Sequence, residues 1–132
     1  MVSYRTSLGR AKGLGSAKHG VGHWITERIT SVALVPLSLW AILAVLNLSR
    51  VGYDGAILWL HSPINAVLAA LLMLITFQHM HAGLRVVVED YIHKPGTKAT
   101  LLLLNLFACV LFAALALFSI LKVALTSSGM SV

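Results

Sequence analysis

The sequence predicts an all-α integral membrane protein with three transmembrane helices. Of its 132 residues, 58% are hydrophobic and only 11% are charged, a balance that excludes an ordinary soluble domain. Three apolar runs, about residues 29–48, 63–88 and 100–125, are each long enough to cross a bilayer. We therefore expect one three-helix transmembrane domain over residues 29–125, with no residues left for a second domain.

Residues 1–28 form a cationic arm ahead of the first span. The arm holds five Lys or Arg residues against one acidic residue, Glu27. The second connection adds Lys94 and Lys98, whereas the first connection and the last stretch of the chain hold one cation each. By the positive-inside rule, these counts predict that the N-terminus and the second connection are cytoplasmic. The net charge of +6 is thus a topology signal, and no nucleic-acid partner is expected.

The composition of the arm also bears on the location of the protein. A secretory signal would place an apolar core close to its start, and the arm has none. Its Arg- and Ser-rich, acid-poor character resembles a mitochondrial transit peptide only weakly. We favour the bacterial inner (cytoplasmic) membrane over the mitochondrial inner membrane.

The first span enters the membrane through residues 26–31, and its interior contains Pro36. A proline removes one backbone donor, which predicts a bend or a local loosening there. The stretch from Ser49 to Ser62 mixes turn formers such as Gly52 with interface-seeking aromatics such as Trp59. It predicts a short loop on the outer surface.

The second span ends at about Val88, and Pro95-Gly96 then breaks the chain before the third span. The third span is rich in Leu, Ala and Phe, with Asn105 as its one amide, and predicts a helix that packs and contacts lipid. Its lone cysteine, Cys109, predicts a packing residue. Residues 126–132 are expected to form a short C-terminal tail.

The second span is the candidate functional element, because its His79–Tyr91 segment puts histidines inside an apolar run and carboxylates at its end. Such groups are costly at membrane depth. On an ideal helix Asp90 returns to within about 20° of His79, whereas His81 lies about 200° away. If Asp90 marks the membrane surface, His79 lies about 16 Å deeper, near the middle of a hydrocarbon core about 30 Å thick. Three helices are few for enclosing a cofactor. The polar face of the second span that carries His79 and Asp90 therefore implies a partner subunit that covers it.

A midplane imidazole can bind a metal, relay protons or ligate haem iron. Zinc is disfavoured, because it needs about four ligands and His79 and His81 point in opposite directions. Haem needs only two axial ligands, of which His79 could supply one and a second chain the other. Gly83, one turn further on, would leave room for a flat macrocycle. The alternative is that His79 is a hydrogen-bonded packing residue.

The end of the second span has two possible roles as well. Asp90 and Tyr91 could hydrogen-bond a quinone carbonyl, and Asp90 could deliver protons that its reduction consumes. Alternatively, these residues simply mark the headgroup region, where tyrosines collect.

Arg28, at the start of the first span, could pair with haem propionates or with lipid phosphate, because its planar donor fork suits both.

A histidine followed four residues later by glycine, and then seven residues later by Asp-Tyr, resembles the smaller (D-type) membrane anchor subunit of succinate dehydrogenase, respiratory complex II. His79, Gly83, Asp90 and Tyr91 make this pattern. Three further segments resemble the same subunit: Met1–Ser3, Leu8–Arg10 and Arg28–Ser31. The resemblance covers essentially the whole chain, and its specificity lies in the segment from His79 to Tyr91.

By this resemblance, His79 is an axial ligand to a single b-type haem that is shared with a histidine of the sister C-type anchor subunit. Tyr91 hydrogen-bonds ubiquinone with Asp90 as its polar neighbour, and Arg28 contacts a haem propionate. The resemblance implies packing with the sister anchor and docking of an FAD-containing flavoprotein and an iron–sulfur subunit on the cytoplasmic face. The chain is then a subunit of succinate:quinone oxidoreductase that is not catalytic alone.

The chain departs from some relatives at His81, Arg85 and Glu89. His81 offers a second candidate ligand, although helical phase favours His79, and Glu89 leaves the proton route open. Three alternatives remain: a fumarate reductase anchor that uses menaquinone, a structural adaptor without a redox centre, and a proton-conducting element built on both histidines.

Overall fold

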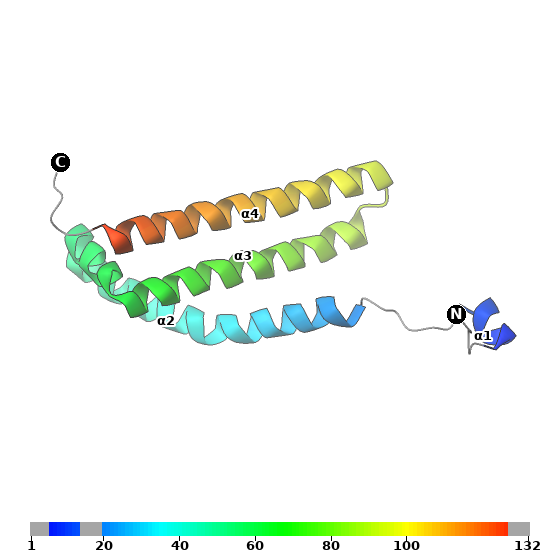
Figure 1. Cartoon of the computed structure of the whole chain (residues 1–132), viewed down its shortest axis with the longest axis horizontal. Helices are drawn as coiled ribbons and strands as arrows, with labels where there is room; N and C mark the ends of the chain where they lie inside the picture. Colours follow the sequence, from blue (N-terminus) through cyan, green and yellow to red (C-terminus); the bar gives the residue numbers. More distant parts are fainter. Residues whose placement is uncertain (1–5, 14–19, 127–132) are drawn as a thin grey trace.

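The computed structural model describes residues 6–13 and 20–126, and nearly all of them are helical (Figure 1). The helices are α1 (Ser7–Ala11), α2 (Gly20–His61), α3 (Pro63–Tyr91) and α4 (Pro95–Leu125). The described residues contain no strand, and α2, α3 and α4 are each long and apolar enough to cross a membrane. The predicted all-α fold with three membrane-spanning helices is therefore confirmed.

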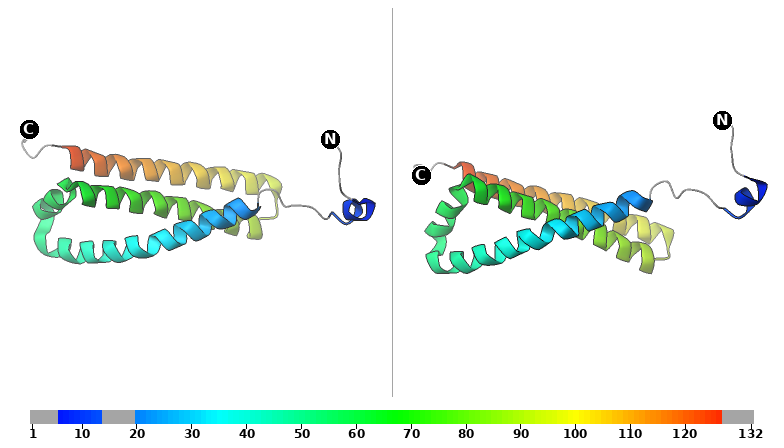
Figure 2. Two further views of the ribbon diagram at one scale, coloured as in Figure 1. Left: turned by 60° about the horizontal axis from the view of Figure 1, so that its bottom comes forward. Right: turned by 90° about the horizontal axis from the view of Figure 1, so that it is seen from below.

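The three long helices run in alternating directions, with α3 between the other two (Figure 1). Short connections enforce this arrangement: Ser62 alone separates α2 from α3, and residues 92–94 separate α3 from α4. Pro63 and Pro95 each stand at the start of a helix, where a missing N–H costs nothing. The start of α2 therefore lies at the same end of the bundle as the end of α3, and α2 crosses α3 obliquely (Figure 2).

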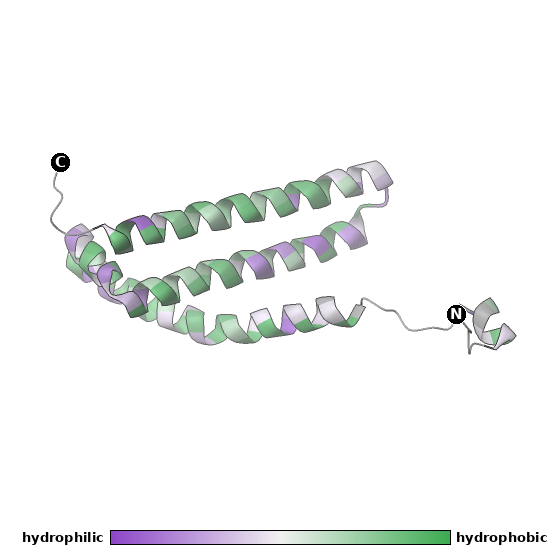
Figure 3. Cartoon of the chain, in the orientation of Figure 1, coloured by the Kyte–Doolittle hydropathy of each residue, from purple (hydrophilic) through white to green (hydrophobic). Residues whose placement is uncertain are grey.

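Small side chains form the interior of the bundle. The buried residues among those described are Thr30, Ala44, Ala66, Ala82 and Cys109. Small residues let transmembrane helices approach closely. Close packing then holds the helices together, because the hydrophobic effect does not drive helix association within lipid. Large apolar side chains are instead exposed on all three long helices. Most of the length of these helices is hydrophobic (Figure 3). This surface suits lipid and further transmembrane helices.

The stretch from Ser49 to Ser62 is not a loop, so this prediction is wrong. Helix α2 continues to His61 and departs from helical dihedrals at Gly52, whose φ is 69° and ψ is −168°. Only glycine adopts this region readily, so one residue makes the turn that a loop was expected to make. After it the chain folds back, and Trp59 stacks on Trp40 with 5.5 Å between ring centroids.

Pro36 lies inside α2 without a break, since Gly52 is where the described helix leaves helical dihedrals.

At the start of α3, the Asn65 side-chain amide donates a 2.9 Å hydrogen bond to the Trp59 backbone oxygen. This bond ties the folded-back end of α2 to α3. It also satisfies a carbonyl near a helix end, where intrahelical partners run out.

Candidate functional site

His79 contacts α2 from its position in the second half of α3. Its Nδ1 atom lies 3.0 Å from the hydroxyl oxygen of Thr30. The Thr30 side chain is 9% exposed, and His79 is half-buried. The antiparallel packing of α2 and α3 brings these residues together across 49 positions of sequence. A ring nitrogen of the predicted ligand is therefore engaged by a buried hydroxyl of the neighbouring helix.

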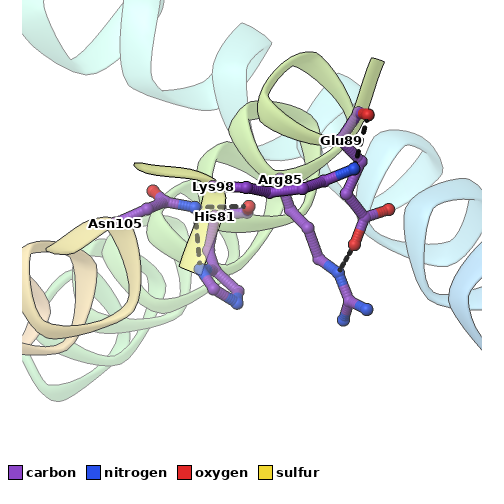
Figure 4. Close-up of polar contacts among 5 residues, drawn as sticks. All are labelled: His81, Arg85, Glu89, Lys98 and Asn105. Carbon is purple, nitrogen blue, oxygen red and sulfur yellow. Dashed lines mark hydrogen bonds and ion pairs between the residues drawn. The ribbon is translucent and has the colours of Figure 1, made fainter. Parts of the chain in front are cut away.

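His81 contacts α4 instead (Figure 4). The Asn105 Nδ2 atom lies 3.1 Å from His81 Nδ1 and also donates to the His81 backbone oxygen at 3.0 Å. The Cys109 thiol completes the cluster by donating to Asn105 Oδ1 at 3.4 Å. The two histidines thus face different neighbouring helices, as the helical phase predicts. Cys109 is buried, in keeping with its predicted packing role.

Gly83 lies one turn after His79 and is exposed. A Cβ atom built on it would meet nothing within 4 Å. Packing within this chain therefore does not require glycine at this position. Gly83 thus leaves open surface on α3, one turn along the helix from His79.

Asp90 and Tyr91 lie about three turns beyond His79, at the end of α3. Both are exposed, and Tyr91 retains 76% of its accessible surface. The structure therefore leaves the phenol at the surface of the chain, where a ligand or a second subunit can reach it. It does not place either residue against His79.

Two charged residues near the end of α3, Arg85 and Glu89, pair with each other. Arg85 Nε donates to Glu89 Oε1 at 2.8 Å, one helical turn apart (Figure 4). Lys98 of α4 donates to the Glu89 backbone oxygen at 2.8 Å, which ties the end of α3 to the start of α4. Both Arg85 and Glu89 are solvent-accessible, so the pair contributes little to stability.

Arg28 is exposed near the start of α2, two residues before Thr30. Its guanidinium lies 5.5 Å from the centre of the Trp24 ring, within the range of a cation–π contact. Arg28 lies close in sequence to Thr30, the residue that contacts His79.

Within residues 6–13 and 20–126, no three His, Cys, Asp or Glu side chains lie close enough together to hold a metal ion. A haem iron needs fewer protein ligands than a free metal ion, because the macrocycle occupies four coordination positions and the protein supplies only the axial ligands. One histidine from this chain is compatible with that chemistry.

The sequence reasoning missed two residues of this region, Thr30 and Asn105, as hydrogen-bond partners of the histidines. A hydroxyl and an amide inside apolar spans were signals that each needs a partner, because unsatisfied polar groups are costly in hydrocarbon. Which histidine each one meets depends on how α2 and α4 are set against α3. Sequence periodicity within one helix does not contain that information.

Comparison with known proteins agrees with the fold. Residues 2–117 match the family of succinate dehydrogenase/fumarate reductase transmembrane subunits. The succinate dehydrogenase hydrophobic membrane anchor subunit of Rickettsia conorii is 32% identical over 111 residues, covering 83% of this chain and 88% of the relative.

Two other anchor subunits of the same name are also similar. That of Rickettsia bellii is 36% identical over 102 residues, covering 76% of this chain and 80% of the relative. That of Paracoccus denitrificans is 26% identical and covers 86% and 88%. The chain therefore belongs to the succinate dehydrogenase/fumarate reductase transmembrane subunit family, as a membrane anchor subunit of succinate dehydrogenase.

Proposed function

We propose that this subunit binds one side of a b-type haem through His79 and forms part of a ubiquinone site through Asp90 and Tyr91. The observation that carries the proposal is the pair of histidine environments on α3. His81 is engaged by Asn105 of the same chain through both its ring and its backbone. Among residues 6–13 and 20–126, His79 is held at Nδ1 by Thr30, and Gly83 lies one turn further along the same face of α3.

Each residue of the haem side has a distinct task in this proposal. His79 would hold the haem iron together with a histidine of the C-type anchor. Gly83 lets the macrocycle approach the backbone of α3, because no side chain stands there. Arg28 offers its exposed guanidinium to a propionate carboxylate, which planar donors bind well. When bound, the haem supplies a one-electron redox centre within the membrane.

The quinone side lies at the end of α3. Reduction of a quinone to a quinol takes two electrons and two protons, so the site needs donors to the carbonyl oxygens. The Tyr91 hydroxyl donates to one carbonyl, and the exposed Asp90 carboxyl passes protons from water to the bound quinone. Glu89 forms an ion pair with Arg85, so Asp90 is the carboxyl that we assign to this role.

The electrons come from succinate through partner subunits. We propose that the end of the bundle with the start of α2 and the end of α3 faces the cytoplasm, as the cationic residues there favour. The FAD-containing flavoprotein and the iron–sulfur subunit dock at this end. The exposed apolar surface of the helices is covered by the C-type anchor and by lipid.

A visible spectrum of the gently solubilised native complex, recovered through this chain, tests the proposal. A reduced-minus-oxidised difference typical of b-type haem, together with ubiquinone in the extract, supports it. A complex without haem removes His79 as a ligand. Menaquinone in place of ubiquinone favours the fumarate reductase alternative, and a preparation without haem or quinone favours a structural adaptor.

We expect Gly83→Leu to reduce the haem content of the complex without preventing membrane insertion. A Cβ atom at position 83 meets nothing of this chain within 4 Å, so we expect the added side chain to clash with the haem and not with the rest of this chain. Overpacking costs about 1–3 kcal/mol, which weakens binding roughly 5- to 150-fold. Pyridine haemochrome analysis per mole of complex measures the loss.

Gly96→Leu is the matched control, because a Cβ at Gly96 likewise meets nothing within 4 Å and the residue lies at the start of α4. Its haem content should equal that of the wild type. Full haem occupancy in Gly83→Leu would show that the macrocycle does not lie against this part of α3.

A further inference from the structure

The Thr30 hydroxyl has three possible hydrogen-bond partners but only one proton. Its oxygen lies 2.9 Å from the Thr26 backbone oxygen, 3.1 Å from the Glu27 backbone oxygen and 3.0 Å from His79 Nδ1. The two carbonyl oxygens can only accept. Threonine in a helix commonly donates to the carbonyl three or four residues earlier. The Thr30 proton is therefore directed to its own helix, and an oxygen lone pair faces His79.

This assignment determines the protonation of the histidine ring. A lone pair on Thr30 requires a hydrogen on His79 Nδ1, since one of the two atoms must donate. A neutral imidazole carries a single N–H, so Nε2 is left with its lone pair. Metal-binding histidines show this pattern, with one nitrogen on the metal and the other donating to a fixed acceptor.

His81 is held in the opposite way. The Asn105 amide nitrogen donates to the His81 backbone oxygen, which can only accept, and this fixes which end of the amide faces α3. The same nitrogen then donates to His81 Nδ1, so the ring hydrogen of a neutral His81 is on Nε2. A nitrogen that carries a hydrogen cannot ligate iron. The tautomers therefore separate two histidines that are only two positions apart.

We propose that Thr30 is a positioning residue that holds His79 as its Nδ1–H tautomer and so makes Nε2 the iron-binding atom. The proposal rests on the haem function proposed above. The burial of Thr30 supports it, because a hydroxyl in an apolar interface keeps its hydrogen bonds instead of exchanging them with water. The contact is also interhelical, so it orients the ring relative to α2 as well as to its own helix.

The hydrogen bond should affect the iron as well as the ring. An acceptor at Nδ1–H makes the imidazole more basic, and a more basic ligand favours ferric over ferrous iron. Loss of the Thr30 hydroxyl should therefore raise the midpoint potential of the haem. It should also weaken haem binding by about 10- to 100-fold, as is typical for loss of an outer-shell partner of a ligand.

The experiment uses the intact complex with Thr30→Val, which keeps the shape of the side chain and removes its hydroxyl. Redox titration of the haem and electron paramagnetic resonance of its ferric form are the readouts, and both are independent of turnover. We expect a higher midpoint potential and altered g values, because the ring loses its fixed orientation. Thr30→Ser, which keeps the hydroxyl, should restore both towards the wild type.

Thr26→Val is the matched control. Thr26 lies one turn earlier on α2 and donates to the Gly22 backbone oxygen, away from the histidines. Its haem should have the wild-type potential. If Thr30→Val does not assemble, Thr30→Ser and Thr30→Ala provide the same comparison, because they differ from each other only in the hydroxyl.

The outcomes separate the two proposals. A wild-type complex without haem overturns both. A wild-type complex with haem, in which the valine and alanine variants keep the wild-type potential and g values, overturns the role of Thr30 and leaves His79 as a ligand. The positioning role is supported if Thr30→Val changes the midpoint potential and the g values of the haem, and Thr30→Ser restores both. Thr26→Val should then leave both at their wild-type values.

Discussion

The complex carrying His79→Ala is expected to lose its haem, whereas the complex carrying His81→Ala keeps it. His79 is the proposed axial ligand, so its removal should cost more than the roughly 10- to 100-fold that loss of an outer-shell partner costs. His81 engages Asn105 of the same chain, and its ring bond is one of two that the amide makes to that residue. Optical spectra of the two purified complexes, normalised to protein, give the comparison.

The two variants should also differ in stability. His81→Ala removes one neutral hydrogen bond between α3 and α4, worth about 1 kcal/mol. The His81→Ala complex should keep its haem and have a slightly lower melting temperature than the wild type. His79→Ala loses the stabilisation that a bound ligand gives to the folded state.

Added imidazole provides a further test of the His79→Ala variant. The small molecule can occupy the space of the missing ring and restore an axial ligand. Partial return of the haem spectrum on its addition supports ligation by His79. Equal loss of haem in both variants would instead show that the helical phase does not separate the two histidines.

Tyr91→Phe is expected to slow ubiquinone reduction while the haem content stays unchanged. The substitution removes only the hydroxyl from a side chain that is 76% exposed, so it should change the stability of the fold little. A neutral hydrogen bond is worth about 0.5–1.5 kcal/mol, which corresponds to a roughly 2- to 10-fold lower rate. Succinate-driven reduction of a soluble ubiquinone analogue by the whole complex measures it.

Tyr53→Phe is the matched control for this prediction. Tyr53 is 79% exposed and lies at the opposite end of the bundle, just after Gly52. It loses the same hydroxyl from a comparably exposed ring, and its complex should turn over at the wild-type rate. A wild-type rate in Tyr91→Phe would remove Tyr91 from the quinone site and leave it as an interfacial aromatic.

Composition and apolar run length were enough to predict three spans, because a bilayer about 30 Å thick demands about 20 apolar residues from each crossing helix. The connection between the first two spans was predicted less well. The turn formers between Ser49 and Ser62 indicated a loop, but Gly52 alone makes the turn and the rest is helical. Backbone groups near the membrane favour internal hydrogen bonds, so helix persists where a soluble protein would form a loop.

Helical phase also separated His79 from His81, because residues two apart on one helix face different directions whatever surrounds them. The partners of these histidines could not be found that way. Thr30 lies 49 residues before His79, and Asn105 lies 24 residues after His81. Their contacts depend on how α2 and α4 are shifted and rotated against α3, and that register comes from the packing of small residues between whole helices. Local periodicity describes each helix by itself, whereas the side chain that contacts each histidine ring belongs to a neighbouring helix.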